Sequence, residues 1–134
     1  MHIEDAVLAY LKTQSGLTTL VGTRIYPEEV PETVQLPAVT YILVSNVPIH
    51  VLTGKITLER PVYQYTAYAA TKAAARAIAA QIALALSDYH GTLSGVVVQK
   101  IELQNEMSTL ISSADGTNKT YTHDLEFEIT YERT

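Results

Sequence analysis

Residues 119–132 read KTYTHDLEFEITYE, and they contain the cleanest alternation of polar and apolar side chains in the chain. Successive side chains of a β-strand point to opposite faces, so this pattern predicts a strand with one buried face. The core-facing side chains are expected at the odd positions Tyr121, His123, Leu125, Phe127, Ile129 and Tyr131. The even positions are expected to face water, among them Asp124, Glu126, Glu128 and Glu132.

Three more stretches predict strands that would join this one in a sheet. Residues 38–45 (AVTYILVS) are apolar on both faces and rich in β-branched side chains, which is typical of a central or doubly covered strand. Residues 56–69 predict a strand with a bulge or an edge at Pro61, because proline cannot donate a backbone hydrogen bond. Residues 96–107 predict the third of these strands. The segments between strands read as loops: 26–36, 46–55 and 108–118.

Two segments predict helices. Apolar side chains recur at helical spacing in residues 3–14, and residues 17–21 allow one more short turn. Residues 72–88 are rich in alanine and follow Thr71, which is a good N-cap. The order α-β-β-α-β-β predicts an α+β fold with one domain over residues 1–134. We expect a mainly antiparallel sheet of about four strands with both helices on one face.

Composition and charge exclude several classes of protein. The 134 residues include no cysteine, so disulfides, thiolate nucleophiles and cysteine-ligated zinc are excluded. The net charge is −5 and the nine Lys and Arg residues form no cluster, which argues against specific nucleic-acid binding. Neither a signal peptide nor a membrane span is recognisable, so the protein is expected to be soluble and cytoplasmic when made.

The residue types that carry catalysis or bind cofactors do not converge in the sequence. His123 and Asp124 are neighbours in a strand and therefore point to opposite faces. His2, His50 and His90 are scattered without metal-ligand spacing, and no phosphate-binding loop is present. The carboxylates at positions 124, 126, 128 and 132 predict an acidic sheet face exposed to solvent, which in a ring-forming protein could line the lumen. We therefore expect no enzymatic activity, no catalytic residue, no metal and no cofactor.

Large apolar side chains in two predicted loops are candidates for an assembly interface. Leu110 and Ile111 lie in an otherwise polar segment, and a second group lies between residues 46 and 55. This second group comprises Val47, Ile49, Val51 and Leu52. Such side chains either fold back onto the core or form a patch that a partner covers, and the sequence favours neither.

The order of these segments resembles the tail-completion, or minor tail, family of long-tailed phages, and it is similar in layout to the tail terminator of phage lambda. The resemblance is carried by LVGTRIYP (20–27), LPAVTY (36–41), Gly54, residues 60–69 before the alanine-rich helix, and HDLEFEITY (123–131). Arg24, Tyr26 and Pro27 match a short motif of the family, to which we assign a structural role in a turn.

The resemblance implies a structural virion protein of a phage or prophage. It would form a hexameric ring at the head-proximal end of the tail, end the polymerisation of the tail tube and take part in head-tail joining. The partners would be further copies of the chain, the tail-tube protein and the head connector or neck proteins, with no membrane involved. The protein would be found in the host cytoplasm during assembly and then in the virion tail. Two alternatives stay open: another neck or tail-tube component, and a small ligand-binding α+β domain.

Overall fold

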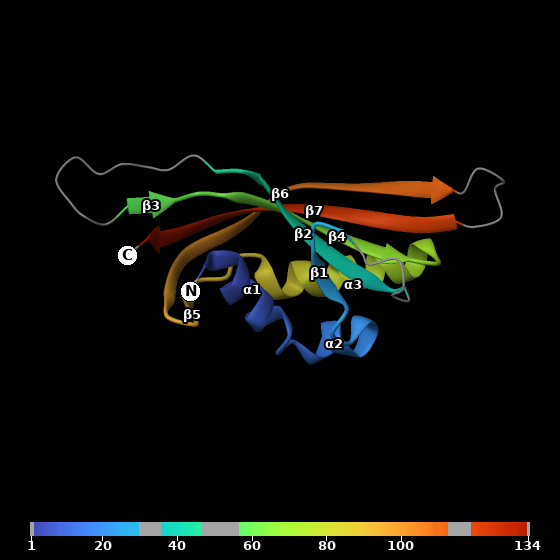
Figure 1. The fold of residues 1–134 in the computed structure, drawn as a ribbon, viewed down its shortest axis with the longest axis horizontal. Coiled ribbons are helices and arrows are strands. Elements are labelled where there is room, and N and C mark those ends of the chain that lie inside the picture. Colours follow the sequence, from blue (N-terminus) through green and yellow to red (C-terminus); the bar gives the residue numbers. More distant parts are fainter. Residues whose placement is uncertain (1, 30–35, 47–56, 113–118, 134) are drawn as a thin grey trace.

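The structure is a computed structural model, and it describes residues 2–29, 36–46, 57–112 and 119–133. These residues form three helices and seven strands, and Figure 1 shows the helices together on one side of the sheet. The helices are α1 (Ile3–Leu11), α2 (Ser15–Val21) and α3 (Lys72–Leu86). The strands are β1 (Ile25–Pro27), β2 (Ala38–Ser45), β3 (Thr57–Glu59), β4 (Val62–Ala69), β5 (Gly91–Leu93), β6 (Val96–Ser112) and β7 (Lys119–Arg133). The α+β class is as predicted.

Side chains at their first turns explain where two of the helices begin. The ring Nδ1 of His2 accepts a hydrogen bond from the backbone N–H of Glu4 (3.3 Å), which caps α1. The Thr71 hydroxyl accepts one from the N–H of Ala74 (3.1 Å), and α3 follows as the sequence predicts. α1 ends before residue 14, and α2 is a separate helix where only a single turn was expected.

The sheet has the strand order β1-β2-β4-β7-β6-β5, with β3 pairing the C-terminal end of β7. β1 is parallel to β2, and the other pairs are antiparallel. The prediction of about four strands is therefore wrong in number and in order. β1, β3 and β5 have three residues each, too few to show an alternation. Pro61 lies between β3 and β4 and divides the predicted strand 56–69 in two.

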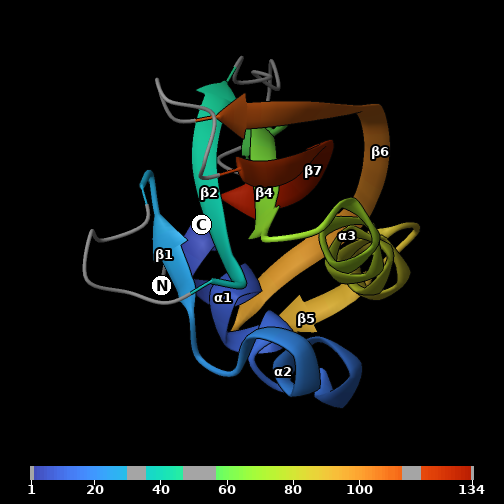
Figure 2. The same cartoon turned by 90° about the vertical axis from the view of Figure 1, so that its right-hand side faces the viewer.

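β6 is the longest strand, with 17 residues, and it extends through a segment that the sequence predicted to be a loop. Residues 108–112 pair with β7 from His123 back to Lys119. Hydrogen bonds to β7 thus pair the backbone of this segment. Its side chains are mostly polar, so its sequence lacked the apolar pattern that indicates a strand. Two register shifts, at Val98/Lys100 and Leu103/Asn105, interrupt the pairing. Bulges bend a strand, and Figure 2 shows β6 curving from β7 toward β5 on the helix side.

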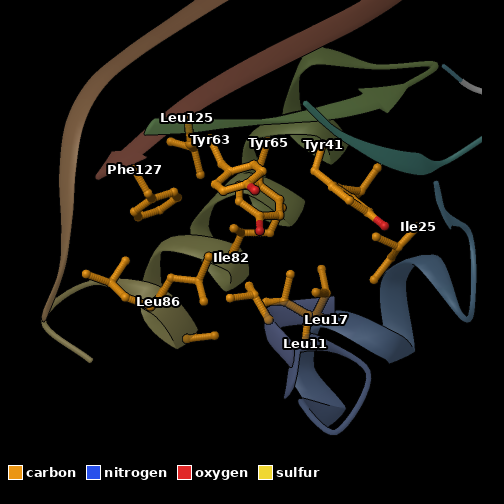
Figure 3. Packing of buried hydrophobic residues seen from close by; sticks show 14 of the residues in the cluster. Leu11, Leu17, Ile25, Tyr41, Tyr63, Tyr65, Ile82, Leu86, Leu125 and Phe127 are labelled. Atoms are coloured by element: carbon orange, nitrogen blue, oxygen red, sulfur yellow. The ribbon is translucent and has the colours of Figure 1, made fainter. Parts of the chain in front are cut away.

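The hydrophobic core lies between the helices and the sheet face that they cover (Figures 1 and 3). The predicted core side chains Leu125, Phe127, Ile129 and Tyr131 are buried, while Tyr121 and His123 are half-buried. Aromatic rings continue the core across the strands. The Tyr41 and Tyr65 centroids are 5.9 Å apart, and those of Tyr65 and Phe127 are 6.1 Å apart. These distances are typical of favourable ring contacts.

β2 does not have the doubly covered position that the sequence predicted. Residues 38–41 are buried, whereas residues 42–45 are exposed. β1 pairs only with residues 39–41, so the exposed part of β2 lies beyond the end of β1. An apolar pattern on both faces was correct for a strand but did not specify how far its neighbours extend.

Candidate assembly surfaces

Leu110 and Ile111, the predicted interface residues, lie in β6 and not in a loop. They pair with Tyr121 and Thr120 of β7, yet the two side chains are 47% and 51% exposed. We call residues 107–111 the distal half of β6 and residues 96–103 its proximal half. The distal half therefore combines a paired backbone with unburied aliphatic side chains.

The two residues point to opposite faces of the hairpin. Leu110 lies opposite Tyr121, on the face that the helices cover elsewhere in the sheet. There it lines a shallow pocket of about 220 Å³ together with Tyr121, Ser108 and Lys72 at the start of α3. Ile111 takes the other face, because successive strand residues alternate. A flat partner surface could cover only one of them, whereas a partner lying along the strand edge could contact both.

A bulge in β6 creates an ion-pairing contact that the sequence did not predict. The register shift between Leu103 and Asn105 places Glu106 opposite Leu125, on the helix-covered face. There Glu106 Oε1 lies 2.6 Å from Nε2 of His123. His123 Nδ1 is buried and has no hydrogen-bond partner among the described residues. Regular alternation from Leu103 would have turned Glu106 away from His123.

The four predicted acidic residues share the sheet face opposite the helices, where the register places Glu126 between Gln64 and Asn105. Amide side chains donate to two of them: Asn105 to Glu126 (3.2 Å) and Gln99 to Glu132 (3.1 Å). Asp124, Glu126, Glu128 and Glu132 are half-buried, so this acidic face is less solvated than expected.

Among the described residues, positive charge lies near the acidic face at the end that carries Lys100 and Arg60. Lys100 pairs with Glu102 at 3.0 Å, and both side chains line a shallow hollow with Arg60 and Glu128. The face therefore keeps an acidic stretch around Asp124 and Glu126.

A second set of exposed apolar side chains lies on β2, in a stretch that the sequence pattern predicted to be buried. Ile42, Leu43 and Val44 are 46%, 46% and 49% exposed. On this stretch β2 pairs only with β4 among the described residues. The available signal was the apolar run itself, which we interpreted as burial on both faces.

The motif residues Arg24, Tyr26 and Pro27 lie in and next to β1. Arg24 Nε donates a hydrogen bond to the carbonyl oxygen of Pro37 (2.8 Å), and Val39 N–H donates to the carbonyl of Arg24 (2.9 Å). Tyr26 and Pro27 pair with residues 40 and 41 of β2. The motif thus ties the segment after α2 to the start of β2.

A buried carboxylate and a buried tyrosine meet where β3 pairs with β7, and two further buried tyrosines, Tyr63 and Tyr65, lie in β4. The Tyr131 hydroxyl donates a short hydrogen bond to the buried Glu59 carboxylate. Burial raises the pKa of the Tyr63 hydroxyl, and the nearby Glu4 carboxylate raises it further. Burial also raises the pKa of Tyr65. These phenols stay protonated at neutral pH, which suits a structural role.

Some predicted features cannot be placed. Val47, Ile49, Val51 and Leu52 lie outside the described residues. Among the residues that are described, no three His, Asp or Glu side chains gather in a way that could hold a metal ion. No helix in the described part of the chain is long and apolar enough to cross a bilayer.

Comparison with protein families decides what kind of protein carries these surfaces. The sequence model of the family described as tail completion protein gp17 matches residues 5–132. The chain belongs to this family. As a tail completion protein it is a structural component of a phage tail, which agrees with the resemblance found in the sequence.

The fold of this tail completion protein is also found in a solved structure. One chain in the virion of a native gene transfer agent (GTA) particle superimposes with a TM-score of 0.68 at 23% sequence identity. The match covers 98% of each chain. Comparison with curated proteins finds no match. The structural similarity establishes a shared fold over nearly the whole length.

Proposed function

We propose that this tail completion protein forms a ring at the head-proximal end of a phage or prophage tail. The ring would end polymerisation of the tail tube and provide the surface for head-tail joining. The observation that carries the proposal is the family match over residues 5–132. The similarity to a chain of a gene transfer agent virion supports it, because that chain is also part of an assembled particle.

The surfaces of the chain fit a role in assembly. Exposed aliphatic side chains at Leu110 and Ile111 are suited to contacts with another subunit or with the tube. The acidic face around Asp124 and Glu126 suits the lumen of a ring, since negative charge there would let DNA pass without sticking. The partners in this proposal are five further copies, the tail-tube protein and a head connector or neck protein.

A protein with this role needs neither catalysis nor a cofactor. The absence of cysteine removes thiolate chemistry, and the carboxylates of Asp124 and Glu126 lie side by side on the sheet face opposite the helices. We therefore propose that activity resides in binding surfaces only. Addition of a chelator should leave the melting temperature unchanged, whereas tight stoichiometric zinc would contradict the proposal.

Deletion of the gene, followed by electron microscopy of the particles, tests the role directly. Without a terminator, tail tubes should exceed their normal length and fail to join heads, and the wild-type gene supplied in trans should restore both properties. Quantitative mass spectrometry of complemented tails should give about six copies per tail. Copies in proportion to tail length would instead identify a tube component, and a single copy per tail would rule out a ring.

A further inference from the structure

Each edge region of the sheet consists of a long strand that a three-residue strand covers at one end only. β1 pairs with residues 39–41 of β2, and β5 pairs with residues 96–98 of β6. Beyond these covered ends, β2 pairs only with β4 and β6 only with β7 among the described residues. The sheet therefore has two bare edge segments: residues 42–45 of β2 and most of the remainder of β6.

The bare part of β6 is not uniform along its length. Residues 100–106 carry Lys100, Glu102 and Glu106 and contain a bulge, which are devices that keep an edge strand from pairing with another chain. Residues 107–111 read MSTLI and carry no charge and no register shift. Residues 42–45 of β2, ILVS, are likewise uncharged and exposed, and their own register shift, between Leu43 and Ser45, lies toward the far end of the segment. Two short, uncharged edges thus remain in the described part of the chain.

We propose that residues 107–111 of one copy pair with residues 42–45 of β2 in the next copy, so that the sheet continues from subunit to subunit. This inference rests on the proposed ring. Because β2, β4, β7 and β6 alternate in direction, β2 and β6 are antiparallel, and rotation about a ring axis would preserve that relation in the contact. Two different edges in one contact make it head-to-tail, the kind that closes into rings.

The two bare segments lie at opposite ends of the sheet along the strand direction. Ile42 is in the row of Gln64, Glu126 and Asn105, whereas the distal half begins two rows further on and extends away from Ile42. If these two segments pair, each copy must be displaced along the strand direction relative to its neighbour. A shift of this kind tilts the strands against the ring axis, as in closed β-barrels. The sheet face that carries Asp124 and Glu126 could then line the inside.

Charges next to the two segments are complementary. In the proposed contact the end of the neighbour's β6 lies in line with β1, close to Glu28 and Glu29. Both of these carboxylates are exposed, and the N–H of Glu28 donates to the carbonyl of Tyr41 (2.9 Å), directly before the bare segment. Lys119 pairs with the last residue of β6 and is exposed as well. The neighbour's Lys119 would therefore approach an acidic turn, which favours a second copy as the occupant.

Cysteine cross-linking in assembled tails tests the pairing, because the natural chain has no cysteine. Ile42→Cys is combined in turn with Met107→Cys, Thr109→Cys and Ile111→Cys, which all share its sheet face. The matched control combines Ile42→Cys with Glu102→Cys, on the same strand and face but in the proximal half. Tails are formed with each variant in place of the natural protein, oxidised, and separated on non-reducing gels. The replaced side chains are exposed, and melting of the purified variants checks that each one folds.

At least one of the three combinations should give a ladder of linked copies up to the full ring, while the control and the single variants give none. Linked dimers from Ile42→Cys alone would indicate a symmetric contact and overturn the pairing. Tails that hold several copies but give no ladder would also overturn it and leave the ring intact. A single copy per tail would reject the ring itself. As a second measure, Lys119→Glu should reduce the yield of completed tails, and adding Glu28→Lys and Glu29→Lys should restore it. No restoration would count against the charge contact.

Discussion

The two halves of β6 use the same class of side chain for different purposes. In the proximal half, Val98 and Ile101 are buried in the core, and Val98 is paired on both sides, with β5 and with β7. In the distal half, Leu110 and Ile111 are about half exposed, and the strand pairs only with β7 among the described residues. A large aliphatic side chain stabilises the fold in the first half and is available to a partner in the second. Whether such a side chain is buried or exposed depends on the neighbouring strands and helices and not on the residue type.

The largest effect is expected from a change in the proximal half. Ile101→Ala removes a side chain that is fully buried, so it should lower the free energy of unfolding by about 2–5 kcal/mol. Denaturant unfolding of the purified protein measures this loss, and Val97→Ala, at a more exposed position of the same strand, is the control. A loss for Ile101→Ala no larger than for the control would break the distinction between the two halves.

High pH sharpens the comparison, because it destabilises the core through a buried tyrosine whose pKa is raised. The pKa of Tyr65 is raised in the folded protein, so the neutral phenol is favoured there, and its contribution to stability is complete below the unfolded pKa of about 10. Above that pH the unfolded state loses the proton first, and stability should fall by about 1.4 kcal/mol per pH unit for such a tyrosine.

Tyr65→Phe should therefore lose less stability than the wild type between about pH 9 and pH 11. Unfolding by denaturant at the two pH values measures the difference. Tyr26→Phe, at a half-buried position in β1, serves as the control. Equal losses in Tyr65→Phe and the wild type would contradict the prediction.

The smallest effect on the isolated chain is expected in the distal half. The double change Leu110→Ser with Ile111→Ser should shift melting little, since both side chains are already half exposed and the strand keeps its pairing with β7. The same variant should give tails of uncontrolled length or tails that do not join heads, because the exposed area is the proposed contact. Thermal melting and electron microscopy of tails measure the two parts. A variant that unfolds, while its residual folded fraction still completes tails, would show that these residues belong to the core.

The parts of the fold with a strong local pattern could be predicted from sequence. The C-terminal strand and the alanine-rich helix were found because alternation and the Thr71 cap are local signals. The three-residue strands could not be found, since their existence depends on neighbours far away in the chain. Leu110 and Ile111, the candidate interface residues, are exposed, but the loop predicted around them was wrong because backbone pairing leaves no trace in a polar segment. The exposed stretch of β2 was missed because an apolar strand looks the same in sequence whether or not a neighbour covers it.

The bulge between Leu103 and Asn105 gives the hairpin a degree of modularity. The bulge takes up one extra residue of β6. Which side chains of the distal half face the helices is therefore independent of the alternation in the proximal half. Adding two residues to each strand beyond the bulge would lengthen the hairpin and keep every core position in place. Adding one residue would exchange the two faces of the distal half and leave Ile101 where it is. Selection can therefore vary the length and chemistry of the contact region while the fold that carries it stays constant.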